Sequence, residues 1–264
     1  MLFSQVEEPP ASAAGTERES ALVELDRFLA SLGFESVPTL GAVLVAERSE
    51  EHRRRIVSAL GRLGSQSEDA TAALVDFLHS RTGNATVGGE LANCVKVMGA
   101  LKNKTSFDAL LEMVFNSRFP VELKALAVRS LAEHPRGAEE AALFVKLVRE
   151  AGDPGLRAEA ASALGRLRPD GALKALMDAL DREQDPEATR AIIASLGQLS
   201  DPSSLQALEK RARPPSEKEV RLGAVSAIAS IGGLESLSIL KALEATEPDP
   251  GVRRHLERWI EKMK

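Results

Sequence analysis

The stretch DPGLRAEAASALGRL, residues 153–167, decides the fold because related copies follow it at a constant spacing. Moving on by 32 residues at a time gives DPEATRAIIASLGQL (185–199), EKEVRLGAVSAIASI (217–231) and DPGVRRHLERWIEKM (249–263). Self-similarity at a fixed period of this length is the signature of a repeat array. In such an array each unit packs only on its neighbours, so a chain of 264 residues can extend without a single central core.

Counterparts of one reference position, Leu164, mark a series of related helices, which we call B helices. The reference positions are Leu29, Leu60, Met98, Leu131, Leu164, Leu196, Ile228 and Ile260. Shorter apolar-periodic segments lie between them, and these A helices are expected to begin near Val37, Thr71, Ser106, Glu139, Ala172, Ser204 and Glu235. The step from Leu60 to Met98 is the longest, and the Gly-rich stretch at 79–90 predicts an inserted loop there. The sequence therefore predicts an all-α superhelix of about 15 helices.

Local signals explain why the repeated segment is helical. Asp153 precedes Pro154, a pair typical of an N-cap followed by the first helical residue, and the same pair recurs at 185–186 and 249–250. At 100° per residue the apolar side chains of this helix form one buried stripe. The stripe consists of Leu156, Ala160, Ala163, Leu164 and Leu167. Glycine recurs one place after the reference residue, for example at Gly165, which indicates close approach of a neighbouring helix.

A second column lies seven residues before the reference position and is rich in arginine. It contains Arg53, Leu91, Lys124, Arg157, Thr189, Arg221 and Arg253. An acidic cap lies four residues before this position in four of the repeats. One interpretation is a ladder of Asp and Arg between adjacent repeats. The other is a set of isolated i,i+4 pairs within single helices, each contributing only about 0.2–0.5 kcal/mol.

The pattern D-P-x-[VL]-R-x-x-A-x-x-A-L-G-x-L resembles bacterial HEAT-like repeats, the kind also found in phycobilin lyases. The match is best at 153–167 and looser at 51–63, 87–101 and 120–134. The resemblance implies antiparallel helix pairs stacked in a right-handed superhelix, with the B helices on the concave side. It implies little about activity, because one fold hosts many functions.

The two ends of the chain differ from the repeats. Residues 1–19 lack helical periodicity and carry Pro9-Pro10 and several glutamates, which predicts a disordered acidic tail before a single array at 20–264. Near 250–263 the column that reads Val225 in the preceding repeat becomes Glu257, as a polar capping helix requires. Trp259 replaces a small residue there and is expected to close the core, with a partner anchor as the alternative.

Signals for catalysis are missing from the sequence. The chain has four histidines and one cysteine, without a Cys/His cluster or an H-E-x-x-H pattern. HEAT-like deoxyhypusine hydroxylases bind iron through His-Glu motifs, and this chain has no His-Glu dipeptide. Cys94 falls in an apolar column, which predicts a buried thiol. We therefore expect no catalytic residues, no cofactor and no metal.

The same composition suggests a compartment. A lone cysteine suits a reducing environment. Neither a secretory signal nor an apolar run of the roughly 20 residues needed to span a bilayer is apparent. A cytoplasmic protein without a membrane partner is the expectation.

The B-helix arc opposite the core is the candidate binding surface. It comprises the positions −6, −5, −2 and +2 relative to the reference residue, and ten basic residues stand there against two acidic ones, although the formal net charge of the chain is −5. Such a bias would attract an anionic partner. The alternative is that Arg and Lys simply suit solvated helix surfaces. The residues expected to bind a partner are Lys96, Arg129, Arg166, Arg190, Arg62 and Arg54.

Three functions follow from this surface or from the resemblance. The first is a non-catalytic scaffold or adaptor that holds an acidic protein segment or surface in a basic concave groove, with the tail glutamates Glu7, Glu8, Glu17 and Glu19 as an internal competitor. The second is nucleic-acid binding, as in HEAT-like alkylpurine DNA glycosylases, which the acidic net charge and scarcity of aromatic residues disfavour. The third is an enzyme resembling phycobilin lyases, for which no catalytic residue can be assigned.

Overall fold

The computed structural model describes residues 14–65, 67–81, 88–133 and 138–263. Within these ranges it contains fifteen α-helices, two short 3-10 helices and no strand, which confirms the all-α prediction. The odd-numbered helices carry the reference residues of the B helices. They are α1 (Ala14–Ser31), α3 (Glu50–Gly64), α5 (Gly89–Leu101), α7 (Val121–Leu131), α9 (Pro154–Leu167), α11 (Pro186–Leu199), α13 (Lys218–Ile231) and α15 (Pro250–Lys262).

The even-numbered helices correspond to the predicted A helices, and most begin within three residues of the expected position. They are α2 (Val37–Ala46), α4 (Glu68–Ser80), α6 (Lys104–Phe115), α8 (Ala138–Glu150), α10 (Ala172–Arg182), α12 (Leu205–Arg211) and α14 (Gly233–Thr246). The 3-10 helices Phe34–Ser36 and Pro202–Ser204 lead into α2 and α12. The helix periodicity of the sequence therefore predicted every helix of the described chain.

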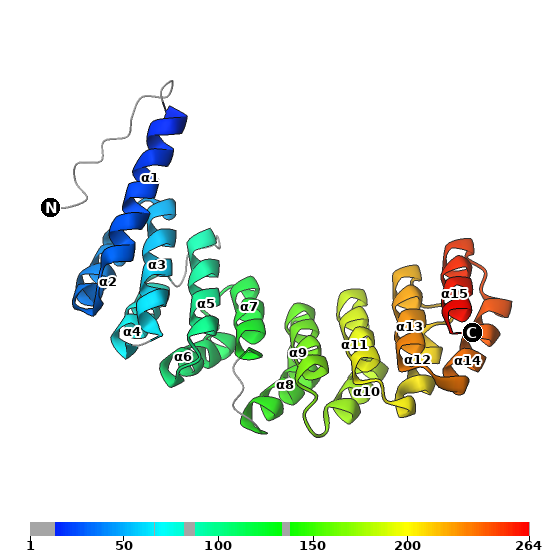
Figure 1. The fold of residues 1–264 in the computed structure, drawn as a ribbon. Helices are drawn as coiled ribbons and strands as arrows, with labels where there is room; N and C mark the ends of the chain where they lie inside the picture. The colour runs from blue at the N-terminus through cyan, green and yellow to red at the C-terminus, as the bar shows by residue number, and fades with distance from the viewer. Residues whose placement is uncertain (1–13, 66, 82–87, 134–137, 264) are drawn as a thin grey trace. The chain divides into compact units, whose positions relative to one another are not determined.

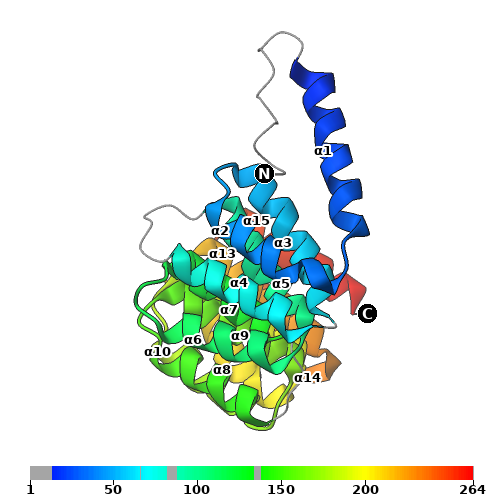
Figure 2. The same cartoon turned by 90° about the vertical axis from the view of Figure 1, so that its left-hand side faces the viewer.

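The helices group into two compact units. Unit 1 is Met1–Ala109 and unit 2 is Leu110–Lys264, so the division falls inside α6. In unit 1, α3 packs on α4 and α5, and α2 packs on α4. Figure 2 shows α1 projecting past α2 and α3. Its main contact in unit 1 is with α3. Val23 and Phe28 of α1 remain exposed as a consequence.

Unit 2 consists of two rows of helices. Figure 1 shows α9, α11, α13 and α15 standing side by side in chain order, with α8, α10, α12 and α14 forming the second row. Contacts between successive odd-numbered helices hold the first row together. Each repeat thus packs on its sequence neighbours, as stacking of a helical repeat requires.

The predicted caps begin three helices of unit 2. Asp153 Oδ1 accepts a hydrogen bond from the backbone N–H of Leu156 at 3.0 Å, and Asp185 and Asp249 each accept two such bonds from the first turns of α11 and α15. A proline follows each aspartate at the start of the helix. These bonds satisfy backbone N–H groups that have no partner within the helix.

Burial confirms most of the predicted core stripe of α9. Ala160, Ala163 and Leu164 are fully buried and Leu156 is 8% exposed. Leu167, which was expected in the same stripe, is 38% exposed. It is the last residue of α9, and the left-handed backbone of Arg168 turns the chain away directly after it, so no neighbouring turn covers Leu167.

The recurring glycines lie where neighbouring odd-numbered helices approach most closely. A Cβ atom at Gly165 would lie 2.9 Å from Ser195 Cα of α11, and one at Gly197 would lie 3.0 Å from Ala227 Cα of α13. In unit 1, a Cβ at Gly61 would lie 2.3 Å from Val97 Cγ1. The packing interpretation of these glycines is therefore confirmed, since no side chain fits at these contacts.

Helices take in part of each segment that was predicted to be irregular. Helix α1 begins at Ala14, so it takes in 14–19 of the expected tail, where Glu and Arg favour a helix, while 1–13 lie outside the described residues. The inserted loop expected at 79–90 is bounded by Ser80 at the end of α4 and Gly89 at the start of α5, and 82–87 lie outside the described residues.

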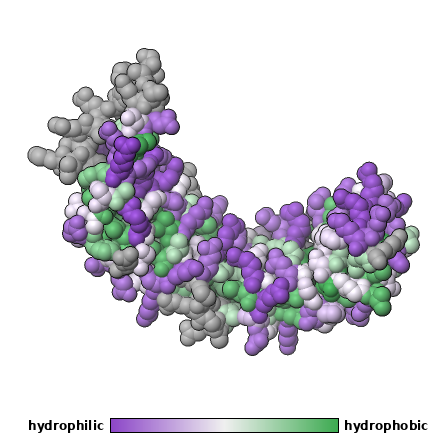
Figure 3. Space-filling view, in the orientation of Figure 1, coloured by the Kyte–Doolittle hydropathy of each residue, from purple (hydrophilic) through white to green (hydrophobic). Residues whose placement is uncertain are grey.

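Helix α15 has the polar surface expected of a capping helix. Glu257 and Glu261 are exposed, whereas the equivalent of Glu257 in the preceding repeat, Val225, is fully buried. Figure 3 shows hydrophilic side chains gathered over α15. Trp259 is half-buried, so its indole closes only part of the core beneath it.

Over the described residues, no single helix has the length and apolar content needed to cross a bilayer. The two helical segments Glu19–Ser31 and Phe34–Ala46 have this length and apolar content only when taken together, and a 114° bend separates them.

Candidate interaction face of the odd-numbered helices

Arginines of the predicted ladder do join adjacent repeats, but their acidic partner is a glutamate and not the aspartate of the cap. Arg157 donates from Nε to Glu183 Oε2 at 2.6 Å and from Nη2 to Glu183 Oε1 at 2.8 Å. Arg221 makes the same paired contact with Glu247, at 3.2 and 2.9 Å. Both glutamates are buried. The cap aspartates accept backbone N–H groups of their own helices instead, and Asp249 also pairs with Lys218 of α13 at 3.3 Å.

The ladder glutamates stand two residues before a helix cap. Glu183 Oε1 also accepts from the backbone N–H of Asp185 at 3.0 Å, and Glu247 Oε1 accepts from that of Asp249 at 2.9 Å. The hydrogen bond from Arg157, above all other causes, lowers the pKa of Glu183. In the sequence, the spacing E-x-D occurs before Pro186 and Pro250 but not before Pro154, and it would have identified these two partners.

The same arginines hold the turn that precedes their own helix. Arg157 Nη1 donates to the carbonyl oxygens of Ala151 at 2.8 Å and Gly152 at 3.0 Å. In unit 1, Arg53 Nη1 donates to the carbonyl oxygens of Glu47 and Arg48, both at 2.8 Å, while Nη2 pairs with the carboxylate of Glu90 at 2.7 Å. Arg157 donates from all three of its guanidinium nitrogens within the protein, and Arg53 donates from two, while its buried Nε has no hydrogen-bond partner among the described residues. The ladder arginines are therefore structural, because their guanidinium groups are already engaged within the chain.

The candidate surface itself, which we call the outer face, consists of positions −6, −5, −2 and +2 of the odd-numbered helices. A regular contact crosses it, from position −2 of one helix to position −5 of the next. Arg129 donates to Glu159 at 3.1 Å, and Ser226 Oγ lies 2.8 Å from His255 Nε2. In unit 1, Asn93 donates to Ser58 at 3.3 Å. The alignment of repeats therefore shows which side chains of adjacent helices contact one another on this face.

The six predicted residues divide between the units, with Arg129, Arg166 and Arg190 in unit 2. Arg129 is paired with Glu159, and this hydrogen bond raises the pKa of its guanidinium. Arg166 on α9 and Arg190 on α11 are exposed and have no ion pair or hydrogen-bond partner among the described side chains. Since α9 packs directly against α11, these two arginines offer charge from adjacent helices.

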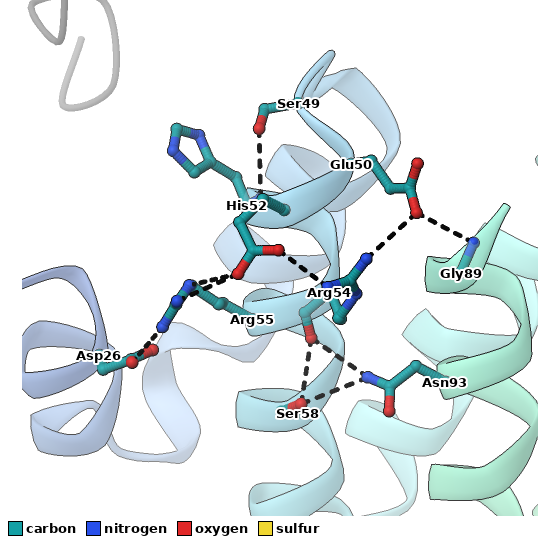
Figure 4. A network of polar contacts seen from close by, with 10 residues as sticks. Asp26, Ser49, Glu50, His52, Arg54, Arg55, Ser58, Gly89 and Asn93 are labelled. Atoms are coloured by element: carbon teal, nitrogen blue, oxygen red, sulfur yellow. Dashed lines mark hydrogen bonds and ion pairs between the residues drawn. The ribbon is translucent and has the colours of Figure 1, made fainter. Parts of the chain in front are cut away.

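Unit 1 holds the other three, and two of them are already engaged. Figure 4 shows Arg54 between carboxylates of its own helix, with Nη2 at 3.2 Å from Glu50 and Nη1 at 2.9 Å from Glu51. Glu50 also accepts from the backbone N–H of Gly89, which ties α3 to α5. Arg62 donates to the carbonyl of Leu29.

Lys96 is the predicted residue of unit 1 that remains exposed without a partner in the described part of the chain. The structure thus leaves three of the six predicted side chains available: Lys96, Arg166 and Arg190.

Groups with catalytic potential are scarce in the described ranges. Cys94 is fully buried, and burial raises the pKa of its thiol, so it lacks the exposed cationic surroundings of a reactive cysteine. No group of three or more His, Cys, Asp or Glu side chains able to hold a metal ion occurs among the described residues. His134 lies outside them.

A family model described as HEAT repeats matches residues 107–196, 141–221 and 181–260. Together these matches span 107–260, which is more than half of the chain. No curated protein sequence matches the chain.

Solved structures of helical repeat proteins resemble it at low sequence identity. Human deoxyhypusine hydroxylase in complex with glycerol is 15% identical, with 87% of this chain and 96% of that chain covered and a TM-score of 0.43. A designed armadillo repeat protein is 18% identical, with coverages of 86% and 100% and a TM-score of 0.40. The complex of CpcE and CpcF of phycocyanin lyase from Nostoc sp. PCC7120 is 18% identical, with coverages of 98% and 97% and a TM-score of 0.38. Similarity at this level supports no functional argument.

Proposed function

Because the chain belongs to the HEAT repeat family, we propose that it is a non-catalytic scaffold or adaptor that binds an acidic protein segment on its outer face. Stacked helical repeats provide an extended surface on which each helix contributes a few side chains. The observation that carries the proposal is the pair Arg166 and Arg190, exposed and unpaired within the described residues, on two helices in direct contact.

The charge of these residues is available to a partner at little cost. A guanidinium that is already paired must exchange one carboxylate for another, whereas Arg166 and Arg190 gain charge-assisted hydrogen bonds on binding. Because the formal net charge of the chain is −5, unpaired cations such as Arg166 and Arg190 would orient an acidic segment toward α9 and α11. Arg129 can bind an acidic segment only if the segment displaces Glu159 from its guanidinium.

Affinity capture with two charge-reversed variants tests this proposal. Arg166→Glu with Arg190→Glu removes the proposed contact. Lys174→Glu with Lys241→Glu is the matched control, because both lysines are exposed on even-numbered helices, α10 and α14. The first variant should lose the proteins that wild type and control retain, as identified by mass spectrometry. Equal recovery by all three proteins would contradict a role for the outer face.

The glutamates near the N-terminus are proposed to compete with this partner. Glu17 and Glu19 belong to α1, while Glu7 and Glu8 lie outside the described residues. Deleting residues 1–13 leaves α1 whole and should raise the affinity for an acidic probe by removing a charge of the same sign. An unchanged affinity would reject this competition.

A further inference from the structure

A cluster of side chains on α13 and α15 surrounds the imidazole of His255. Ser226 Oγ lies 2.8 Å from Nε2, and the indole Nε1 of Trp259 donates to the same nitrogen at 3.1 Å. Arg258 Nη2 lies 3.1 Å from the other ring nitrogen, Nδ1. The ammonium of Lys262 lies 4.8 Å from the centre of the Trp259 ring. Three side chains therefore contact the half-buried imidazole, and a fourth, Lys262, lies over the indole beside it.

This cluster has more donors than acceptors. A neutral imidazole has one N–H and one acceptor nitrogen, while indole and guanidinium can only donate. If the proton is on Nδ1, Trp259 is satisfied and Arg258 faces an N–H. If it is on Nε2, Ser226 accepts it and Arg258 is satisfied, but Trp259 faces an N–H. Either tautomer of His255 leaves one donor without an acceptor, so the cluster lacks one acceptor atom.

The cations around the imidazole ring also lack an anionic partner among the described residues. Arg258 and Lys262 are exposed and form no ion pair within the part of the chain that the structure describes, although Glu257 and Glu261 are on the same helix. Burial first, and then the positive charges of Arg258 and Lys262, lowers the pKa of His255. An anion would meet unpaired cations here, and it would supply the missing acceptor.

We propose that His255, Arg258, Trp259 and Lys262 form a binding site for a side-chain carboxylate of an acidic protein segment. The carboxylate oxygens accept from Arg258 and from the ring N–H, and Lys262 contributes charge beside the indole. The inference rests on the proposed function, and it adds a second contact point on the outer face of unit 2, on a helix other than those of Arg166 and Arg190. A planar guanidinium suits a carboxylate because it can donate two parallel hydrogen bonds.

Trp259 is the one tryptophan of the protein, so its fluorescence reports this site alone. Unlabelled hexaglutamate should change the emission of Trp259 saturably and shift the ring nitrogen resonances of His255. Arg258→Gln should weaken the peptide affinity measured by this signal about tenfold or more. Lys241→Gln on α14 removes the same single charge from an exposed site and should leave the affinity unchanged.

Anisotropy of fluorescein-labelled hexaglutamate separates this inference from the proposed function. If the labelled peptide binds, but Trp259 does not respond and Arg258→Gln binds as wild type does, the site is wrong and the scaffold function stands. If the labelled peptide does not bind wild type, the scaffold function fails, and sodium acetate then tests the site alone. A saturable shift of His255 with acetate, compared with chloride at equal ionic strength, supports the carboxylate site, and its absence overturns the site.

Discussion

Arg157 and Glu183 connect adjacent repeats through two parallel hydrogen bonds, from Nε to Oε2 at 2.6 Å and from Nη2 to Oε1 at 2.8 Å. The same relationship recurs two repeats later between Arg221 and Glu247. Each pair links a B helix to the turn before the next one, because the glutamate also accepts backbone N–H groups of that turn. The stacking of repeats therefore depends on polar contacts at the turns as well as on the apolar core.

Arg221→Ala should lower the free energy of unfolding by about 3 kcal/mol, because it leaves the buried carboxylate of Glu247 without its cation. Arg149→Ala is the control, since its pair with Asp178 is about one-third exposed on both sides and should contribute less than about 1 kcal/mol. Urea denaturation followed by circular dichroism measures both values. Equal losses in the two variants would show that the ladder is not a principal contact between repeats.

The glycine contacts predict opposite effects for the same substitution in α9 and in α13. Gly165→Ala places a Cβ atom 2.9 Å from Ser195 Cα, and the resulting shift of α9 from α11 should destabilise the protein by about 1–3 kcal/mol. Gly223→Ala in α13 meets only Ile193 Cγ2 at 3.8 Å, so it should stabilise the protein by up to about 1 kcal/mol through helix propensity. Thermal unfolding should show a lower Tm for the first and a higher Tm for the second.

Stability should fall in acid in a way that depends on Glu183. Its pKa is lowered in the folded protein, so its contribution is complete above the ordinary glutamic acid value of about 4.3 and is lost as the pH falls through the lowered pKa. Glu183→Gln should therefore show a smaller loss of unfolding free energy between neutral and acidic pH than wild type. Glu187→Gln, at an exposed position in the first turn of α11, serves as the comparison. Parallel pH profiles for wild type and Glu183→Gln would contradict the lowered pKa.

The sequence predicted the helices well because their signals are local. The spacing of Leu164 and its counterparts, the caps at Asp153 and Asp185 and the packing role of Gly165 all follow from one helix and its nearest repeat. Leu167 was placed wrongly, since burial at a helix end depends on the turn that follows.

The candidate site was harder to predict because availability depends on contacts between repeats. Arg129 belongs to a basic column, yet Glu159 of the next B helix occupies it. Arg54 also belongs to one, but its partners Glu50 and Glu51 lie on its own helix, at spacings that the sequence shows. Helical periodicity places a residue on a face and does not say which side chain of the next helix reaches it. Aligning position −2 with position −5 of the following repeat would have revealed the partner of Arg129.

Binding of fluorescein-labelled hexaglutamate, measured by anisotropy at low and at high salt, tests the central claim most directly. Arg166→Glu with Arg190→Glu and the control Lys174→Glu with Lys241→Glu each change the formal net charge from −5 to −9, because two residues go from +1 to −1. Wild type and control should bind the peptide, the affinity should fall as salt rises, and the Arg166 and Arg190 variant should bind about tenfold more weakly or worse. Equal weakening in both variants would contradict the claim, because it would show that the peptide responds to net charge and not to the outer face of α9 and α11.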